Sequence, residues 1–186
     1  MRRRILTLFF IFSVLVGQSR NHDSPDSFQP QNTAELQAAV NLWVSDKTSA
    51  LGVFGDISGW DVSLITDMFR LFLNKTTFND DISSWDVSNV TNMGDMFANA
   101  SNFNGDLSSW DVSSVTNMSA MISGASSFNG DLSSWDVSSV TFMGYMFNGA
   151  SSFNGDISGW DVSSVTNMKY MFRIVTSFNQ DLSSWD

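Results

Sequence analysis

Residues 126–141 read SSFNGDLSSWDVSSVT, and nearly the same sixteen residues recur at 101–116 and at 151–166. The tryptophans set the period of this repeat, because each stands 25 residues after the one before it. They are Trp60, Trp85, Trp110, Trp135, Trp160 and Trp185. A fixed spacing of this size is typical of stacked-repeat folds, in which one unit buries its apolar face only against its neighbours. No insertion breaks the register, so the sequence predicts a repeat domain over residues 53–186.

Each repeat is expected to contain a short strand and a helix. In LSSWDV, residues 107–112, Trp110 and Val112 share one face under the two-residue alternation of a strand. Apolar residues then recur at helical offsets from Val115 to Ala125, and Thr116 is a suitable N-cap. The sequence therefore predicts an α/β solenoid, a leucine-rich-repeat-like stack of about five units with parallel strands. A propeller is disfavoured, since one blade takes roughly 40 residues.

The large apolar side chains of the repeat are expected to form its core. Indole rings in a row can also make an exposed stacking platform, but their position on the Leu and Val face favours burial. The methionines lie on the predicted helical stripe, where packing is a better interpretation than binding of a soft metal. The predicted core residues are Trp60, Trp85, Trp110, Trp135, Trp160, Met93, Met118, Met143, Phe103, Phe128 and Phe153.

The first 52 residues differ from the repeats. Three arginines, twelve mostly apolar residues and a small polar stretch predict a secretory signal peptide over residues 1–19, and the apolar run is short for a permanent membrane span. Residues 20–52 are expected to form a linker and an N-terminal capping helix, with Asn32 or Thr33 as its N-cap. The sequence ends within a predicted strand, so we expect a longer chain, a partner or edge-to-edge self-association to cover that edge.

Composition bounds the functions that this chain can have. The formal net charge of -10 disfavours nucleic acid as a partner, because phosphates are bound mainly by Lys and Arg. The absence of cysteine excludes disulfides, thiolate metal sites and thiol nucleophiles. The lone histidine, His22, has no partners for catalysis, and the carboxylates repeat too evenly to form a tuned acid and base. We therefore expect no enzymatic activity.

Two aspartate columns are polar features that packing does not require. The column that begins at Asp56 precedes each predicted strand and is expected to accept hydrogen bonds from turn backbone. The column that follows each tryptophan is expected to face outward beside serines, where it is suited to calcium or to basic or hydroxyl-rich partners. Its candidate ligand-binding residues are Asp61, Asp86, Asp111, Asp136 and Asp161, with Ser88, Ser113 and Ser138. Calcium is the one cofactor that these columns suggest.

The unit FNGDLSSWDVSSVTNMSAMISGAS, residues 103–126, resembles the BspA-like leucine-rich-repeat surface proteins and the Mycoplasma-type lipoprotein repeats. The resemblance implies a secreted or cell-surface protein whose sheet face engages an extracellular protein or a surface glycan. Adhesion is the usual inference for such proteins, and catalysis is not. This chain has no lipidated cysteine, and single repeats depart from the pattern, as where Leu71 replaces Met and Phe142 replaces Asn.

A threonine column supports a different function. A surface-patterning protein that binds ice, mineral or wall polysaccharide would use hydroxyl groups at a regular spacing. The threonines in question are Thr66, Thr91, Thr116, Thr141 and Thr166.

Overall fold

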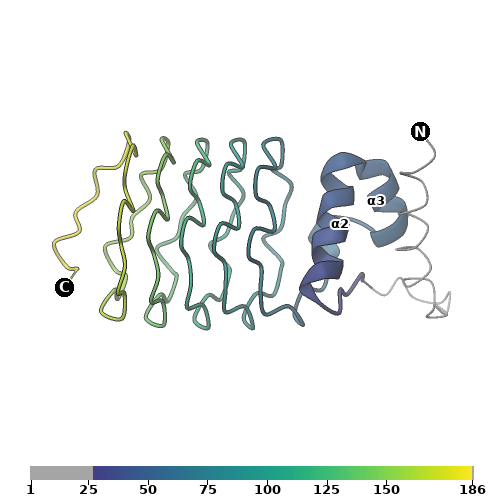
Figure 1. Cartoon of the computed structure of the whole chain (residues 1–186), viewed down its shortest axis with the longest axis horizontal. Helices are drawn as coiled ribbons and strands as arrows, with labels where there is room; N and C mark the ends of the chain where they lie inside the picture. The colour runs from purple at the N-terminus through teal and green to yellow at the C-terminus, as the bar shows by residue number, and fades with distance from the viewer. Residues whose placement is uncertain (1–26, 186) are drawn as a thin grey trace.

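The computed structural model describes residues 27–185, so the predicted signal peptide at residues 1–19 lies outside the described residues. The chain begins with two α-helices, α2 (Thr33–Ser45) and α3 (Lys47–Phe54), and a short 3-10 helix, η1 (Ile57–Gly59). Coils of chain follow and lie side by side, from the helices at one end to the C-terminus at the other (Figure 1). No helix among the described residues is both long and apolar enough to cross a membrane.

Helix α2 begins where the sequence has its capping signal. Asn32 is the N-cap, and its Oδ1 accepts from the backbone N–H of Glu35 at 3.0 Å. The Glu35 carboxylate in turn accepts from the N–H of Gln31 at 2.9 Å. Asp46 ends α2 and caps the next helix, because its Oδ1 accepts from the N–H of Ser49 at 3.1 Å. Helix α3 was not predicted from the sequence.

One wall of each coil is built from consecutive tight turns. We call it the turn wall, and it comprises residues 67–75, 92–100, 117–125, 142–150 and 167–175. Within a coil the N–H of Met121 donates to the carbonyl of Met118 at 3.2 Å. Between coils alternate N–H groups donate to the next coil, as from Met118 to Phe142 at 2.8 Å and from Ala120 to Gly144 at 2.9 Å. Neighbouring coils are thus joined by backbone hydrogen bonds without a regular strand.

The predicted α/β solenoid was wrong. Beyond residue 59 the described chain contains no helix, and residues 27–185 contain no strand or sheet, only isolated parallel bridges such as Asn92 to Asn117. The expected strand at 107–112 is a turn, in which the N–H of Trp110 donates to the carbonyl of Leu107 at 3.1 Å. The expected helix at 115–125 belongs to the turn wall. This part of the turn wall has a left-handed φ of 54° at Ala120, and an α-helix cannot contain such a residue.

The core runs along the axis of the stack. Aromatic rings of successive coils lie face to face, as for Trp135 and Trp160, whose centroids are 6.4 Å apart at an interplanar angle of 4°. Phe103 and Phe128 stack in the same way at 5.9 Å. All eleven side chains assigned to the core from the sequence are buried. Strict spacing by 25 residues places like rings over one another, so packing repeats from coil to coil.

Helix α2 covers the N-terminal end of this stack. The carbonyls of the first turn wall have no preceding coil to bond, and side chains of α2 supply the donors instead. Thr33 Oγ1 donates to the carbonyl of Asp67 at 2.7 Å, and Gln37 Nε2 donates to the carbonyl of Leu71 at 2.9 Å. Buried Leu36, which lies between them in sequence, adds apolar contact. The helix therefore satisfies the edge that the first coil exposes.

Candidate binding site

The aspartates that follow the tryptophans each cap a turn of their own coil. Asp111 Oδ1 accepts from the backbone N–H of Ser113 at 3.0 Å and from its hydroxyl at 2.6 Å. The same pair of bonds joins Asp136 to Ser138, at 3.0 and 2.6 Å. The serine hydroxyls that the sequence suggested as ligand groups are thus donors to the neighbouring aspartate. This contact fixes the orientation of each carboxylate.

The second oxygen of most of these carboxylates remains open. We call Asp61, Asp86, Asp111, Asp136 and Asp161 the acidic column. In Asp61, Oδ2 accepts from Gln29 Nε2 at 2.7 Å. Within residues 27–185, Oδ2 of Asp86, Asp111 and Asp136 accepts from no protein donor, and all three residues are exposed. From Asp86 to Asp136 the structure therefore presents one oriented, accessible carboxylate oxygen per coil.

Local hydrogen bonds lower the pKa of Asp111 and Asp136. The Ser138 hydroxyl, followed by its backbone N–H, lowers the pKa of Asp136 below the ordinary 3.8. The like charges of Asp111 and Asp161 raise that pKa, but they are smaller causes than the two hydrogen bonds. The hydroxyl of Ser113 lowers the pKa of Asp111 in the same way. The hydrogen bonds of Asp111 and Asp136 therefore favour the charged form of these two carboxylates despite the repulsion along the column.

The column that begins at Asp56 accepts backbone hydrogen bonds, as predicted. Asp106 Oδ1 accepts from the N–H of Ser108 at 2.9 Å, and Asp131 Oδ1 accepts from the N–H of Ser133 at 2.9 Å. These backbone bonds are the first cause of a lowered pKa at both aspartates. Both aspartate columns therefore stabilise turns, a role that the sequence assigned only to the first.

The carboxylates are presented singly and do not form a cluster. Within the part of the chain that the structure describes, no three His, Cys, Asp or Glu side chains come together as potential ligands of a metal ion. Calcium takes six to eight oxygen ligands, so a single column residue supplies a small part of such a set.

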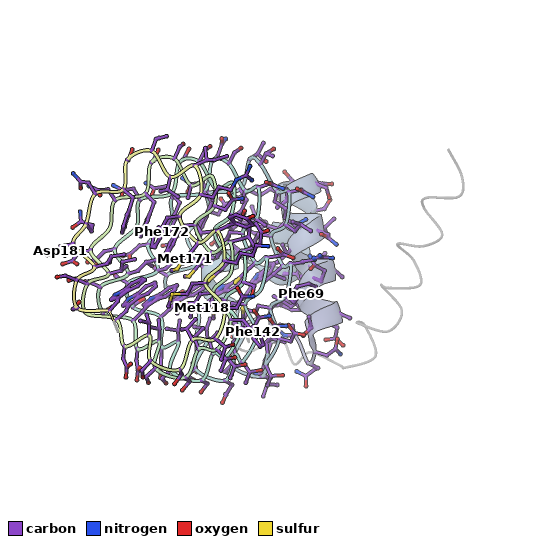
Figure 2. The ribbon with its side chains drawn as sticks, turned by 60° about the vertical axis from the view of Figure 1, so that its left-hand side comes forward. Phe69, Met118, Phe142, Met171, Phe172 and Asp181 are labelled. Atoms are coloured by element: carbon purple, nitrogen blue, oxygen red, sulfur yellow. The ribbon has the colours of Figure 1, made fainter. Side chains whose placement is uncertain are left out.

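A second group of exposed residues was not identified from the sequence. Phe142, Tyr145 and Tyr170 are exposed on the turn wall near the C-terminal end of the stack. In Figure 2, Phe69 and Phe142 lie toward the lower right of the stack and Asp181 at its left-hand edge. The signal that could have found this group is variation within the repeat, since Tyr145 stands where earlier coils carry Arg70, Asp95 and Ala120.

A family model described as "Mycoplasma protein of unknown function, DUF285" matches residues 41–151 and, in a second overlapping match, residues 106–186. The chain belongs to this family. The match supports a Mycoplasma-type repeat family and does not single out leucine-rich repeats, in agreement with coils that lack strands. No curated protein and no solved structure matches the chain.

Proposed function

We propose that this protein is a secreted or cell-surface binding protein without catalytic activity, and that its acidic column holds a basic region of an extracellular partner. The observation that carries the proposal is the free Oδ2 of Asp86, Asp111 and Asp136, each on a carboxylate whose Oδ1 is held by its own turn. Lys and Arg side chains make their strongest hydrogen bonds to such carboxylates.

Preorganisation is the physical reason to expect useful affinity from exposed charges. An exposed ion pair is worth little when two long side chains must be ordered to form it. Here the protein side is already ordered, because Ser113 and Ser138 hold Asp111 and Asp136 through two bonds each. A partner with several cations meets one fixed carboxylate in each coil, so the ordering cost falls mainly on the partner.

Membership of a repeat family agrees with a binding role. Stacked-repeat proteins present long regular surfaces, and such surfaces are commonly used to hold other macromolecules. The predicted leader at residues 1–19 supports an extracellular location.

Substitution of aspartate by asparagine tests the proposal, because asparagine keeps the turn-capping Oδ1 and removes the charge. The test variant combines Asp86→Asn, Asp111→Asn and Asp136→Asn. The control combines Asp81→Asn, Asp106→Asn and Asp131→Asn, which removes the same number of charges from the other column. We expect the test variant to bind an immobilised lysine-rich peptide at least about tenfold more weakly than the control does. Equal loss in both variants would show that net charge, and not the acidic column, is responsible.

The threonine column favours a second candidate function, binding of ice, mineral or wall polysaccharide. Thr116 Oγ1 donates to the carbonyl of Thr91 at 3.1 Å, and Thr141 Oγ1 donates to that of Thr116 at 3.1 Å. Each hydroxyl is thereby fixed in position, and its oxygen can still accept a hydrogen bond. The combined Thr116→Val and Thr141→Val variant should lose thermal hysteresis or crystal binding if this function holds. Absence of either activity in the unmodified chain removes the candidate.

A further inference from the structure

Phe142 stands at a position where the other coils use asparagine or aspartate to cap a turn. Asn92 Oδ1 accepts from the N–H of Gly94 at 3.1 Å, and Asn117 Oδ1 accepts from the N–H of Ser119 at 3.0 Å. A phenylalanine has no acceptor, so the equivalent cap is lost in its coil. Phe142 is also 49% exposed, so little burial offsets the lost cap. A residue that breaks the local rule without a structural gain indicates a functional position.

The two exposed tyrosines are also in unfavourable positions. Tyr145 and Tyr170 have left-handed φ angles of 61° and 58°, a conformation that bulky side chains rarely adopt. The same position is left-handed in the three preceding coils, where it is occupied by Arg70, Asp95 and Ala120, and the last two of these are smaller than tyrosine. Tyr145 is 39% exposed and Tyr170 48%, and their ring centroids lie 5.1 Å apart. The left-handed backbone belongs to this position in every coil, so what distinguishes these two coils is the bulky, exposed aromatic side chain placed on it.

The exposure of this group is not an effect of the last coil alone. Phe142 and Tyr145 belong to a coil that is covered by the next one. The N–H of Met143 donates to the carbonyl of Asn167 at 2.9 Å, and that of Tyr145 donates to the carbonyl of Lys169 at 2.8 Å. Their rings therefore point outward from the wall of a fully stacked coil.

Two cations accompany the rings. Lys169 Nζ lies 4.8 Å from the ring centroid of Tyr170, and Arg173 Cζ lies 5.9 Å from it. Neither cation has an ion-pair partner within residues 27–185. The comparable pair at the other end of the stack is neutralised, because Arg70 over Phe69 donates to Asp95 at 3.0 Å. A protein with a net charge of -10 thus carries a local positive surface beside exposed rings.

We propose that an aromatic-basic patch, formed by Phe142, Tyr145, Lys169, Tyr170 and Arg173, binds an acidic polysaccharide. The apolar faces of sugar rings can lie against the exposed aromatic rings, while carboxylate or sulfate groups pair with the two cations.

A peptide partner is less suited to this patch. An extended peptide gains affinity by adding its backbone to a free edge, and in the coil of Phe142 and Tyr145 the alternate N–H groups already donate to the next coil. The N–H of Phe147, for example, donates to the carbonyl of Met171 at 3.1 Å. Recognition at Phe142 and Tyr145 must therefore rely on side chains, which favours a ligand with flat apolar faces and separate negative charges.

The proposal concerns a surface of opposite charge to the acidic column and is independent of it.

The test uses the full chain, with immobilised heparin as a sulfated probe, hyaluronan as a carboxylated probe and neutral dextran as the control ligand. We expect salt-sensitive binding to at least one acidic probe and none to dextran. The aromatic variant combines Phe142→Asn, Tyr145→Ala and Tyr170→Ala, which return these positions to residue types of other coils. The charge variant combines Lys169→Gln and Arg173→Gln.

Each variant has a matched control. Leu64→Ser removes an apolar side chain that is 50% exposed and lies outside the patch. It also restores the serine that other coils carry at this position. Arg70→Gln removes a cation that is already paired. Both test variants should weaken binding at least about tenfold, and both controls should leave it unchanged. The aromatic variant should also be at least as stable to urea denaturation as the unmodified chain. Failure to bind either acidic probe, equal binding of polyglutamate, or full binding by the aromatic variant would overturn the proposal.

Discussion

Trp135 Nε1 donates to the carbonyl of Leu107, in the preceding coil, at 2.9 Å. The bond recurs along the stack, for example from Trp160 to Leu132 at 3.0 Å. Each indole therefore serves two purposes, since its ring fills the core and its N–H satisfies a buried carbonyl of the neighbouring coil. This second purpose explains why the column consists of tryptophan and not of phenylalanine.

Trp135→Phe should reduce the free energy of unfolding by about 2 to 4 kcal/mol, because it leaves the Leu107 carbonyl unpaired and a cavity beside it. Urea denaturation followed by circular dichroism measures the change. Trp185→Phe is the matched control. Trp185 makes the same bond, to Ile157 at 3.1 Å, but it is only partly buried and water can replace the donor. Equal losses in the two variants would contradict the role of the buried carbonyl.

The positions of the buried residues could be predicted from the sequence, whereas the backbone that places them could not. Val115, Met118 and Met121 are spaced as on a helix, and all are buried. Consecutive turns with a left-handed residue at Ala120 bury the same set, so spacing alone cannot separate the two structures. The turns differ from a helix in their backbone hydrogen bonds to the next coil, such as that from Ala120 to Gly144. The sequence of one repeat does not reveal these bonds between coils.

The candidate site was predictable to a similar extent. The outward position of Asp111 followed from its place after a buried tryptophan, and the residue is exposed. The role of Ser113 as a donor to Asp111 depends on local turn geometry, which the strand interpretation concealed. Tyr145 and Tyr170 could not be predicted from the shared columns, because the repeats have no common residue at this position.

Gly124 is required by a close approach between coils. Its φ is 70°, and an added Cβ would lie 2.4 Å from Asn99 Oδ1. Gly124→Ala should cost about 2 to 3 kcal/mol of stability, from left-handed strain and from loss of the bond between Asn99 and Asn74. Gly149→Ala is the control, because its φ is 75° and its nearest neighbour would be 3.7 Å away. It should show the strain alone, about 1 to 2 kcal/mol. A chemical melt of both variants separates the two contributions, and equal costs would argue against the clash.

Helix α2 should contribute to stability through its two side-chain donors. Thr33→Val removes the hydroxyl that bonds the Asp67 carbonyl, and Gln37→Met removes the amide that bonds the Leu71 carbonyl. Each should cost about 1 to 2 kcal/mol, because the edge carbonyl of the first coil loses its donor. Thr76→Val is the control, since Thr76 is exposed and its hydroxyl donates to no protein group in the described chain. Differential scanning calorimetry of the three variants measures the effect. An unchanged melting temperature in the first two would indicate that water satisfies the edge equally well.

Stability should decline as the pH falls below about 4, because the turn-capping aspartates bind protons more weakly in the folded chain. Hydrogen bonds from Ser108 and Ser138 lower the pKa of Asp106 and Asp136 below the ordinary 3.8. A group whose pKa is lower in the folded state stabilises that state above its unfolded pKa. The contribution is lost as the pH falls through the lower, folded value.

Protonation also relieves repulsion along the columns, which acts in the opposite direction. At Asp136 the like charges of Asp111 and Asp161 are smaller causes than the hydrogen bonds, so the net slope should still be a loss of stability in acid. Urea midpoints at about pH 7, 4 and 2.5 measure this slope. The triple asparagine variant at positions 86, 111 and 136 keeps the caps and removes the titration of Asp111 and Asp136, so its slope should be shallower. A chain that becomes more stable on acidification would show that repulsion between the columns outweighs the hydrogen bonds that hold them.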